Sequence, residues 1–381
     1  IEKFNPEDRD NYLKLLKDSE AIFNKGFEDL ASEPFHKFSS MVSVAPDLVR
    51  LKSFQTVWEF ISRHIESPYL RQAFSIQPLL VGGNPFDTTS IYALIHYLER
   101  KWGVHFIMGG TGALTRALEK LMREENIKIT LNQPVSGISI ENKQAKGVIL
   151  DNGLLEKSDI VISNADPAFL YSKMVANDQQ SGLLRLKTRR AKFSMGLYVL
   201  YFGTTTTYPD VKHHTIWLGQ RYKDLLHDIF NKKIMTQDFS LYLHRPTATD
   251  PSFAPSGCES FYVLAPVPNL QGNVDWTVEG PKLRDRIVKA LGETILPNLE
   301  NTITSEFFKT PEDFQKDYSS VHGAGFSISP HLTQSAWFRY HNKSEDIKNL
   351  YLVGAGTHPG AGLPGVVSSA KVIEKLLPEA A

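Results

Sequence analysis

The stretch NLYLVGAGTHPGAGLPGVVSSAKVIEKLL, residues 349–377, decides how this chain folds. It opens with an apolar run at 350–353, continues through five glycines between 354 and 365, and ends with helical spacing of apolar residues from 366 to 377. The pattern predicts a strand, a glycine loop and a helix. Such a loop lets backbone N–H groups and a helix N-terminus approach an anion or a polar ring edge. We therefore expect a large, partly polar cofactor at this loop.

The loop also contains the pattern GxGxxG at Gly360, Gly362 and Gly365. A dinucleotide fingerprint needs its first glycine at the strand end, a βαβ unit of about 30 residues and an acidic residue about 20 positions further on. Pro364 interrupts the pattern here, and only 16 residues follow Gly365. The glycines are therefore not interpreted as that fingerprint.

Composition describes a globular chain with balanced charge. The 381 residues include 42 Lys plus Arg against 42 Asp plus Glu, with 22% charged and 41% hydrophobic residues. A disordered chain is excluded, and the single cysteine, Cys258, excludes a disulfide framework and a cysteine-rich metal site. Nucleic-acid binding depends on excess positive charge, so no nucleic-acid partner is expected. No apolar run approaches the ~18 residues of a membrane-spanning helix.

The chain divides into four stretches by its pattern. Residues 1–102 have helical spacing and many aromatic residues, whereas 103–166 combine a GGTG turn, a helix at 113–125 and short β-branched runs. Residues 167–320 mix strands and helices, including a helix expected at 281–296, and 321–381 contain the glycine loop. The strands expected in the second stretch are IKIT (127–130), VSGISI (135–140), AKGVIL (145–150) and DIVIS (159–163).

Other chemical motifs are absent from the sequence. It contains no GxxxxGK[ST], HExxH or GxSxG pattern, so the common signatures of NTPases, zincins and α/β-hydrolases are missing. His213 and His214 are adjacent, and on a strand they would point to opposite faces. We therefore predict no metal site.

Several long segments match a known family. They are LLVGGNPF (79–86), WGVHFIMGGTGAL (102–114), ISNAD (162–166), LYVLYFG (197–203), DFSLYLHRPTATDPSFAPSGCESFYVLAPVP (238–268), WTVEGPKLRDRI (276–287), LTQSAWF (332–338) and NLYLVGAGTHPGAGLPGV (349–366). With these motifs the chain resembles the bacterial and fungal type of phytoene desaturase, the carotenoid-forming flavoenzymes. The resemblance covers essentially the whole chain.

The resemblance implies a mixed α/β fold with an FAD-binding, Rossmann-like domain of the amine-oxidase or glutathione-reductase-like type. On that basis 103–166 and 321–381 belong to the FAD domain. Residues 167–320 form a substrate domain, and 1–102 form a helical part that contributes to the substrate region and faces the membrane.

Family members open with a strand, a GxGxxG turn and a helix that hold the ADP half of FAD. This sequence begins IEKFNPEDRD, beyond that unit. The resemblance therefore implies an N-terminally truncated chain without the first βαβ unit. Alone, such a chain is expected to bind FAD weakly or not at all.

Seven positions match places where the family contacts FAD, mostly through the backbone. They are Val135 at the adenine, Ala165 near the same end, Gly354, Ala355 and Gly356 along the pyrophosphate and ribityl chain, and Gly365 and Val366 at the flavin ring. The resemblance also marks Arg71, in SPYLRQAF, as a catalytic polar residue. Ser67 and Pro68 replace acidic residues often found beside it in the family, so no catalytic base is assigned.

The implied activity is desaturation of phytoene by hydride transfer to flavin, giving neurosporene- or lycopene-type products. The implied partners are phytoene and partly desaturated carotenes, a quinone or oxygen as electron acceptor, and a membrane surface met by a cytoplasmic, monotopic enzyme. Two other classes remain open from the residues. One is a related flavoenzyme, such as a carotenoid isomerase, a diapophytoene desaturase or an amine oxidase; the other is a chain without FAD that binds carotenoid or lipid.

Overall fold

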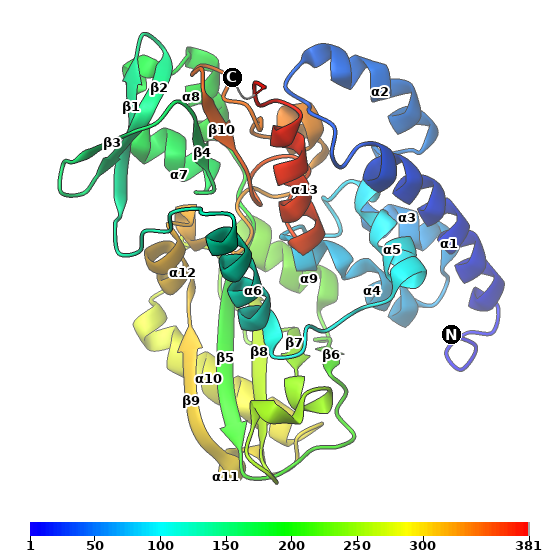
Figure 1. The fold of residues 1–381 in the computed structure, drawn as a ribbon. Helices are drawn as coiled ribbons and strands as arrows, with labels where there is room; N and C mark the ends of the chain where they lie inside the picture. Colours follow the sequence, from blue (N-terminus) through cyan, green and yellow to red (C-terminus); the bar gives the residue numbers. More distant parts are fainter. Residues whose placement is uncertain (380–381) are drawn as a thin grey trace. The chain divides into compact units, whose positions relative to one another are not determined.

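The computed structural model describes residues 1–379 (Figure 1). In this structure the chain forms two compact units. Unit 1 contains residues 1–103 and 133–194 and the part of the chain from 318 onward. Unit 2 contains residues 104–132 and 195–317. Both units are therefore assembled from segments that are distant in the sequence.

Most helices of unit 1 come from the first hundred residues. Its helices are α1 (Asp8–Phe23), α2 (Phe38–Arg50), α3 (Val57–His64), α4 (Pro68–Ser75), α5 (Leu94–Trp102), α7 (Pro167–Phe169), α8 (Gly182–Arg190) and α13 (Leu363–Glu374). Buried Leu15, Phe60 and Ala93 belong to one core that joins the early helices. The helical layer expected at 1–102 is thus confirmed.

Two small sheets complete unit 1. Strands β1 (Val135–Glu141), β2 (Gln144–Leu150) and β3 (Leu155–Lys157) form an antiparallel meander, and β4 (Val161–Ser163) pairs in parallel with β10 (Leu350–Leu352). Asn142 and Lys143, between β1 and β2, both have positive φ, as a tight hairpin turn of the primed type requires. The predicted strands at 135–140 and 145–150 are confirmed.

The strand predicted at IKIT (127–130) is wrong. Residues 128–131 follow the helix without regular structure, and Ile127 and Leu131 are exposed. A strand is stable only where its backbone N–H and C=O groups find a neighbouring strand. Within the described residues no strand pairs with this segment.

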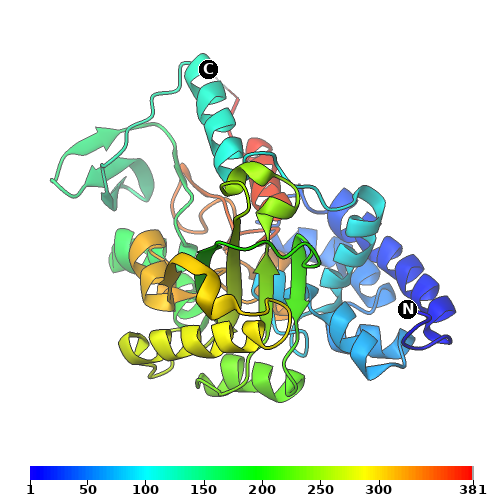
Figure 2. The same ribbon diagram turned by 90° about the horizontal axis from the view of Figure 1, so that it is seen from below.

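Unit 2 is built on one antiparallel sheet in the order β6-β7-β8-β5-β9. Its strands are β5 (Gly196–Thr204), β6 (His214–Trp217), β7 (Leu241–His244), β8 (Glu259–Val267) and β9 (Ile303–Lys309), and its helices are α6 (Gly110–Glu124), α9 (Tyr222–His227), α10 (Trp276–Gly292), α11 (Leu299–Thr302) and α12 (Pro311–Tyr318). Figure 2 shows α10 lying along one face of the sheet. Alternate residues such as Leu200 and Val263 pack there against Ile287 in the main core.

The opposite face of this sheet carries a line of ring side chains that runs across all five strands. In register, from β6 to β9, they are His214, His244, Tyr262, Tyr201 and Phe307. Neighbouring rings lie close: His244 to Tyr262 is 4.5 Å and Tyr201 to Phe307 is 4.7 Å between centroids. We call these five residues the aromatic row. Directly opposed residues share a face, so the row is one continuous surface.

Helix boundaries differ from the predictions by a few residues. The helix expected at 281–296 is α10, which starts at Trp276 because Asp275 Oδ1 accepts a hydrogen bond from Thr277 N (3.0 Å) and caps it. Pro281 lies inside the helix rather than at its start. The C-terminal helix is α13, three residues earlier than expected at its start.

The two units are groups of residues that contact one another within the fold. The four segments expected from the sequence were grouped instead by whether they would bind FAD or substrate. Helix α6 belongs to unit 2 by contacts, although it was grouped with the FAD-binding segment 103–166. Contacts within the chain do not measure those roles, so the assignment of roles stays a prediction. Among the described residues, no helix has the length and apolarity needed to cross a bilayer.

Candidate functional site: a glycine cradle after two parallel strands

The glycine loop leaves the sheet beside the segment that follows β4. Because β4 and β10 are parallel, with Leu352 opposite Ser163, both strands end at the same edge. Val353 N extends the pairing by donating to Ser163 O (3.0 Å). Ala165 and the residues 354–356 therefore follow neighbouring strand ends. The structure brings these four predicted contact positions to one edge.

Two glycines of the loop have no room for a side chain. Gly354 has φ +98°, and a Cβ there would lie 2.3 Å from Asn164 Oδ1. A Cβ on Gly356 would lie 2.3 Å from Pro167 Cδ. The loop thus requires glycine both for its backbone conformation and for its close approach to the segment after β4.

A buried arginine holds the loop from within. Arg339 is 1% exposed, and its Nε donates to Thr357 O (2.9 Å) while Nη2 donates to Ala355 O (2.5 Å). Burial lowers the pKa of this guanidinium, an effect opposed by nearby Tyr92 and Asp166. Bonds to two carbonyls fix the path of the loop and turn its N–H groups away from the arginine.

Side chains from the flanking elements satisfy other groups of the loop. Ser369 Oγ, on α13, accepts from Gly354 N (2.9 Å) and donates to Val366 O (2.5 Å). Asn342 Nδ2 donates to His358 O (2.9 Å) and lies 3.3 Å from Thr357 Oγ1. The loop is consequently held in one shape before any ligand binds.

The loop ends at the N-terminus of α13. A Cβ on Gly365 would lie 2.7 Å from Gly360 O, so the first turn packs directly on the loop backbone. Val366 N donates to Gly362 O (2.9 Å). The positive end of the helix dipole lies beside Gly365 and Val366, where it favours negative charge.

Asp166 lies at the end of the segment that follows β4 and caps the next helix. Its Oδ1 accepts from Ala168 N (2.8 Å) and from Phe169 N (3.4 Å), which caps α7. Burial raises the pKa of this carboxyl, while the two backbone N–H groups act in the opposite direction. Asp166 therefore fixes the turn that carries Ala165 past the glycine loop.

Two predicted residues lie apart from this edge in the fold. Val135 is the first residue of β1, pairs with Leu150 and belongs to the other sheet of unit 1. Arg71 lies on α4, and its Nε donates to Ile65 O (2.6 Å) at the end of α3. That bond has a structural consequence, because it ties α4 to α3.

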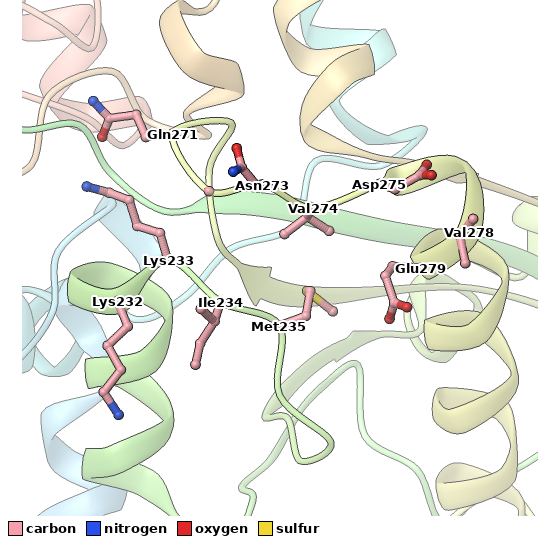
Figure 3. A pocket seen from close by; sticks show the side chains of 11 residues that line it. Lys232, Lys233, Ile234, Met235, Gln271, Asn273, Val274, Asp275, Val278 and Glu279 are labelled. Atoms are coloured by element: carbon pink, nitrogen blue, oxygen red, sulfur yellow. The ribbon is translucent and has the colours of Figure 1, made fainter.

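A cavity of about 620 Å³ lies elsewhere, in unit 2 (Figure 3). Figure 3 shows Lys232 and Lys233 on one side of it and Asp275 and Glu279 on the other. It contains none of the predicted site residues. Its lining combines four charged side chains with the apolar side chains of Ile234, Met235, Val274 and Val278.

Comparison with known proteins identifies the family. The chain is 48% identical over 381 residues to a lycopene-forming phytoene desaturase of Pseudescherichia vulneris, covering all of this chain and 77% of that protein. It is 39% identical over 386 aligned residues to a neurosporene-forming phytoene desaturase of Rhodobacter capsulatus, covering 74% of that protein. The chain belongs to the phytoene desaturase family. No protein-family model matches it.

The fold of this family member is that of amine-oxidase-like oxidoreductases. Cyclohexylamine oxidase from Brevibacterium oxydans superposes with a TM-score of 0.57 over 98% of this chain and 76% of that chain, at 13% identity. The fold class expected from the sequence is thereby confirmed. At that identity the likeness concerns the fold alone.

Sequence reasoning missed Arg339, Asn342 and Ser369. Arg339 follows directly after the motif LTQSAWF, and Ser369 lies early in the predicted C-terminal helix, but the sequence pattern predicts no role for either side chain. Their importance depends on contacts with carbonyl and N–H groups of another segment. No local pattern in the sequence signals such contacts.

Proposed function

We propose that this chain catalyses desaturation of phytoene with FAD, giving neurosporene- or lycopene-type products. The observation that carries the proposal is the 48% identity over the whole chain to a lycopene-forming phytoene desaturase. The preformed glycine cradle supports it, because a large cofactor with a polar chain fits a loop of this kind.

The family and the fold imply a flavin, and the cradle fits FAD. Gly354 and Gly356 let the loop backbone pass directly against Asn164 and Pro167, and α13 begins at the end of the loop, where a helix N-terminus favours an anion. Gly354, Ala355 and Gly356 would hold the pyrophosphate and ribityl chain, with Gly365 and Val366 at the ring. Val135 and Ala165 would meet the adenine end.

A flavin, when bound, supplies the redox chemistry by taking up a hydride from a C–H beside the conjugated triene of phytoene. The chain's own part is to place and shield the reacting carbon. The helix dipole of α13 stabilises negative charge near Gly365. Arg71 remains the predicted catalytic polar residue, positioned through its bond to Ile65.

A hydrocarbon substrate needs an apolar surface, and the aromatic row of unit 2 offers one. Its five rings lie in register across the sheet on the face opposite α10. Flat rings pack well against a conjugated polyene and require no polar partner from it. We infer that Tyr262, Tyr201 and Phe307 of the row contact phytoene and partly desaturated carotenes.

The activity is tested with phytoene in liposomes, FAD and a quinone or oxygen as acceptor. Because the chain spans 77% of the length of a relative, the assay is run on the chain and on a hybrid carrying the relative's additional residues. Coloured, more desaturated carotene with stoichiometric reduction of the acceptor is expected in at least one of the two.

The same assay separates the alternatives. Isomerised carotene with no reduced acceptor would indicate an isomerase, and turnover of only the C30 substrate would indicate a diapophytoene desaturase. Oxidation of an amine in place of phytoene would indicate an amine oxidase. Carotenoid bound by both proteins with no product from either would indicate a binding protein.

We further propose that unit 1 contacts a membrane surface through α2. Phe38, Val42, Ala45 and Val49 follow spacings of four, three and four residues, which place them on one face of the helix. All four are exposed; Phe38 and Val42 are 57% and Val49 is 67% accessible. An amphipathic helix of this kind lies in the plane of the interface and does not span the bilayer.

Vesicle flotation tests the membrane contact. Val42→Asp places a charge on the apolar face, and we expect it to weaken binding to phosphatidylcholine–phosphatidylglycerol vesicles at least ~10-fold, or about 1.4 kcal/mol. Ser43→Asp adds the same charge on another face of α2 and serves as the control. Equal flotation of both variants and of the unmodified chain would contradict the proposal.

A further inference from the structure

Three histidines meet at one edge of the sheet in unit 2. His214 is the first residue of β6, His244 is the last residue of β7, and the two are directly opposed in the antiparallel pair. His213 precedes β6, so it is free of the strand's alternation, and its ring lies 4.4 Å from that of His214 and 4.7 Å from that of His244. Adjacent residues point to opposite faces only where both lie on a strand, which is not the case for His213.

The three side chains offer nitrogen atoms at spacings suited to a shared ion. Each histidine offers one ring nitrogen, and these three nitrogens all lie within 4.8 Å of one another. Zn–N bonds of about 2.0–2.1 Å in a tetrahedron separate two nitrogens by ~3.4 Å. Small side-chain rotations therefore suffice to close the site.

Hydrogen bonds engage the Nδ1 atoms and leave Nε2 for a ligand role. His213 Nδ1 lies 2.5 Å from Thr249 Oγ1, and His214 Nδ1 lies 2.7 Å from the Tyr242 hydroxyl. His244 Nδ1 lies 3.3 Å from the same hydroxyl. His213 Nε2 is buried and has no hydrogen-bond partner among the described residues. Metal-binding histidines are typically oriented in this way by a partner on their other nitrogen.

Burial works against protonation of the three rings, and only a neutral imidazole binds a metal ion. Burial lowers the pKa of His244 to about 4, and the nearby His213 and His214 lower it further. Burial also lowers the pKa of His213, with a contribution from Arg245, and that of His214, with a contribution from His213.

Arg245, the cation that contributes to the lowered pKa of His213, is already paired. Arg245 Nη1 forms a buried ion pair with Glu259 Oε1 (3.0 Å). Phe106 packs against His213 at 4.7 Å between ring centroids and closes one side. His214 is the exposed member and leaves the site open to solvent on its side.

We propose that His213, His214 and His244 bind one divalent late transition-metal ion, with Zn²⁺ the ion that best fits three imidazoles. Three protein nitrogens leave a fourth position for water, in an open site. Such an ion joins the loop before β6 to the end of β7. It is therefore expected to stabilise this edge of unit 2.

Binding of Zn²⁺ alone is measured first. The chain, purified without an affinity tag of histidines and dialysed against chelator, is titrated with Zn²⁺ in competition with a chromophoric chelator. One Zn²⁺ per chain and a melting temperature that rises with Zn²⁺ concentration are the expected results. Absence of saturable one-to-one binding would overturn the proposal.

Variants locate the ion. His214→Ala removes the exposed ligand with little effect on packing and should raise the Kd more than ~100-fold, whereas Thr249→Val should raise it ~10-fold by releasing the His213 ring. His227→Ala, an exposed histidine on α9, is the control and should bind as the unmodified chain does. Circular dichroism in chelator verifies that each variant is folded. Unchanged affinity in folded His214→Ala would place the ion elsewhere and refute the site.

Discussion

At the scale of single residues, Arg339 shows how one side chain can shape a cofactor loop without touching a cofactor. Its guanidinium is buried among carbonyl groups, with bonds to Thr357 O, Ala355 O and Gln334 O. Each of these hydrogen bonds fixes the orientation of one peptide group, so that its N–H points away from the guanidinium. A glycine-rich loop loses much conformational entropy when it becomes ordered. Such hydrogen bonds therefore stabilise a single conformation of the loop.

Replacing this side chain should therefore destabilise unit 1. Arg339→Met fills a similar volume but leaves buried carbonyls without donors, and we expect a loss of about 2–4 kcal/mol in the free energy of unfolding. Urea unfolding followed by circular dichroism measures it. Arg189→Met, at an exposed position on α8, is the matched control. Equal midpoints for the two variants would contradict the role given to Arg339.

His358 makes stability depend on pH. Burial lowers its pKa from 6.5 to about 4, and its Nε2 lies 2.9 Å from Leu30 O. Because the unfolded chain takes up a proton near pH 6.5 and the folded chain only near 4, stability is lost as pH falls between these values. At pH 5 the loss from this residue is about 2 kcal/mol.

The contribution of His358 is separated from that of other buried histidines by substitution. His358→Gln cannot be protonated, so its free energy of unfolding should fall less between pH 7 and pH 5 than that of the unmodified chain. Urea unfolding at the two pH values gives both slopes. Identical slopes would show that the folded-state pKa of His358 is not lowered.

At the scale of elements, the strand–loop–helix unit depends on contact with a segment nearly 190 residues earlier in the chain. β10 pairs with β4, and the loop passes against Pro167 immediately afterwards. Without β4 and the segment after it, β10 would lose its hydrogen-bonded partner strand and the loop would lose contacts that fix its conformation. Tertiary contact turns the glycine pattern into a cradle.

A single methyl group in the cradle tests this dependence. Gly356→Ala places its Cβ against the Pro167 ring and should cost about 1–3 kcal/mol through overpacking. Gly182→Ala, at the first position of α8, meets nothing within 4 Å and should leave stability unchanged or slightly higher. Thermal unfolding measures both, and fluorescence quenching of FAD added to the hybrid with the relative's additional residues should show weaker binding only for Gly356→Ala. Equal stability and FAD binding for the two variants would show that the cradle tolerates a side chain.

At the scale of the whole molecule, segments differ in how fully their backbone is paired, even within unit 2, which contains both β5 and residues 128–131. β5 pairs on both sides, with β8 and β9, and lies at the centre of the largest core. Residues 128–131 have no backbone hydrogen bond to another segment among the described residues. Local stability should therefore vary widely along the chain.

Hydrogen exchange measured by mass spectrometry tests this contrast. Amides of 128–131 should exchange at nearly the rate of an unfolded peptide, whereas those of β5 should exchange roughly 10³-fold or more slowly. β3, a short edge strand, provides an intermediate reference. Protection at 128–131 equal to that of β5 would mean that this segment forms a paired strand after all.

Much of the local structure is predictable from the sequence because it depends on neighbouring residues. Alternation predicts β1 and β2, and the helix at 110–124 follows from its apolar spacing after a glycine turn. The prediction failed at IKIT, where the residues favour a strand but no partner strand is present in the described chain. The expectation of opposite faces for His213 and His214 applied to a strand, and His213 lies just outside the strand.

The sequence by itself determined the family, the glycine loop and the kind of cofactor that loop suits, because these depend on residue types at fixed spacing. Only the tertiary structure decided that Arg339 holds the loop, that Arg71 bonds to α3, and that His244 joins His213 and His214. Each of these depends on where distant segments meet. Distant segments come together because apolar surface is buried and backbone groups pair across the fold. The spacing of residues along the sequence does not contain this information.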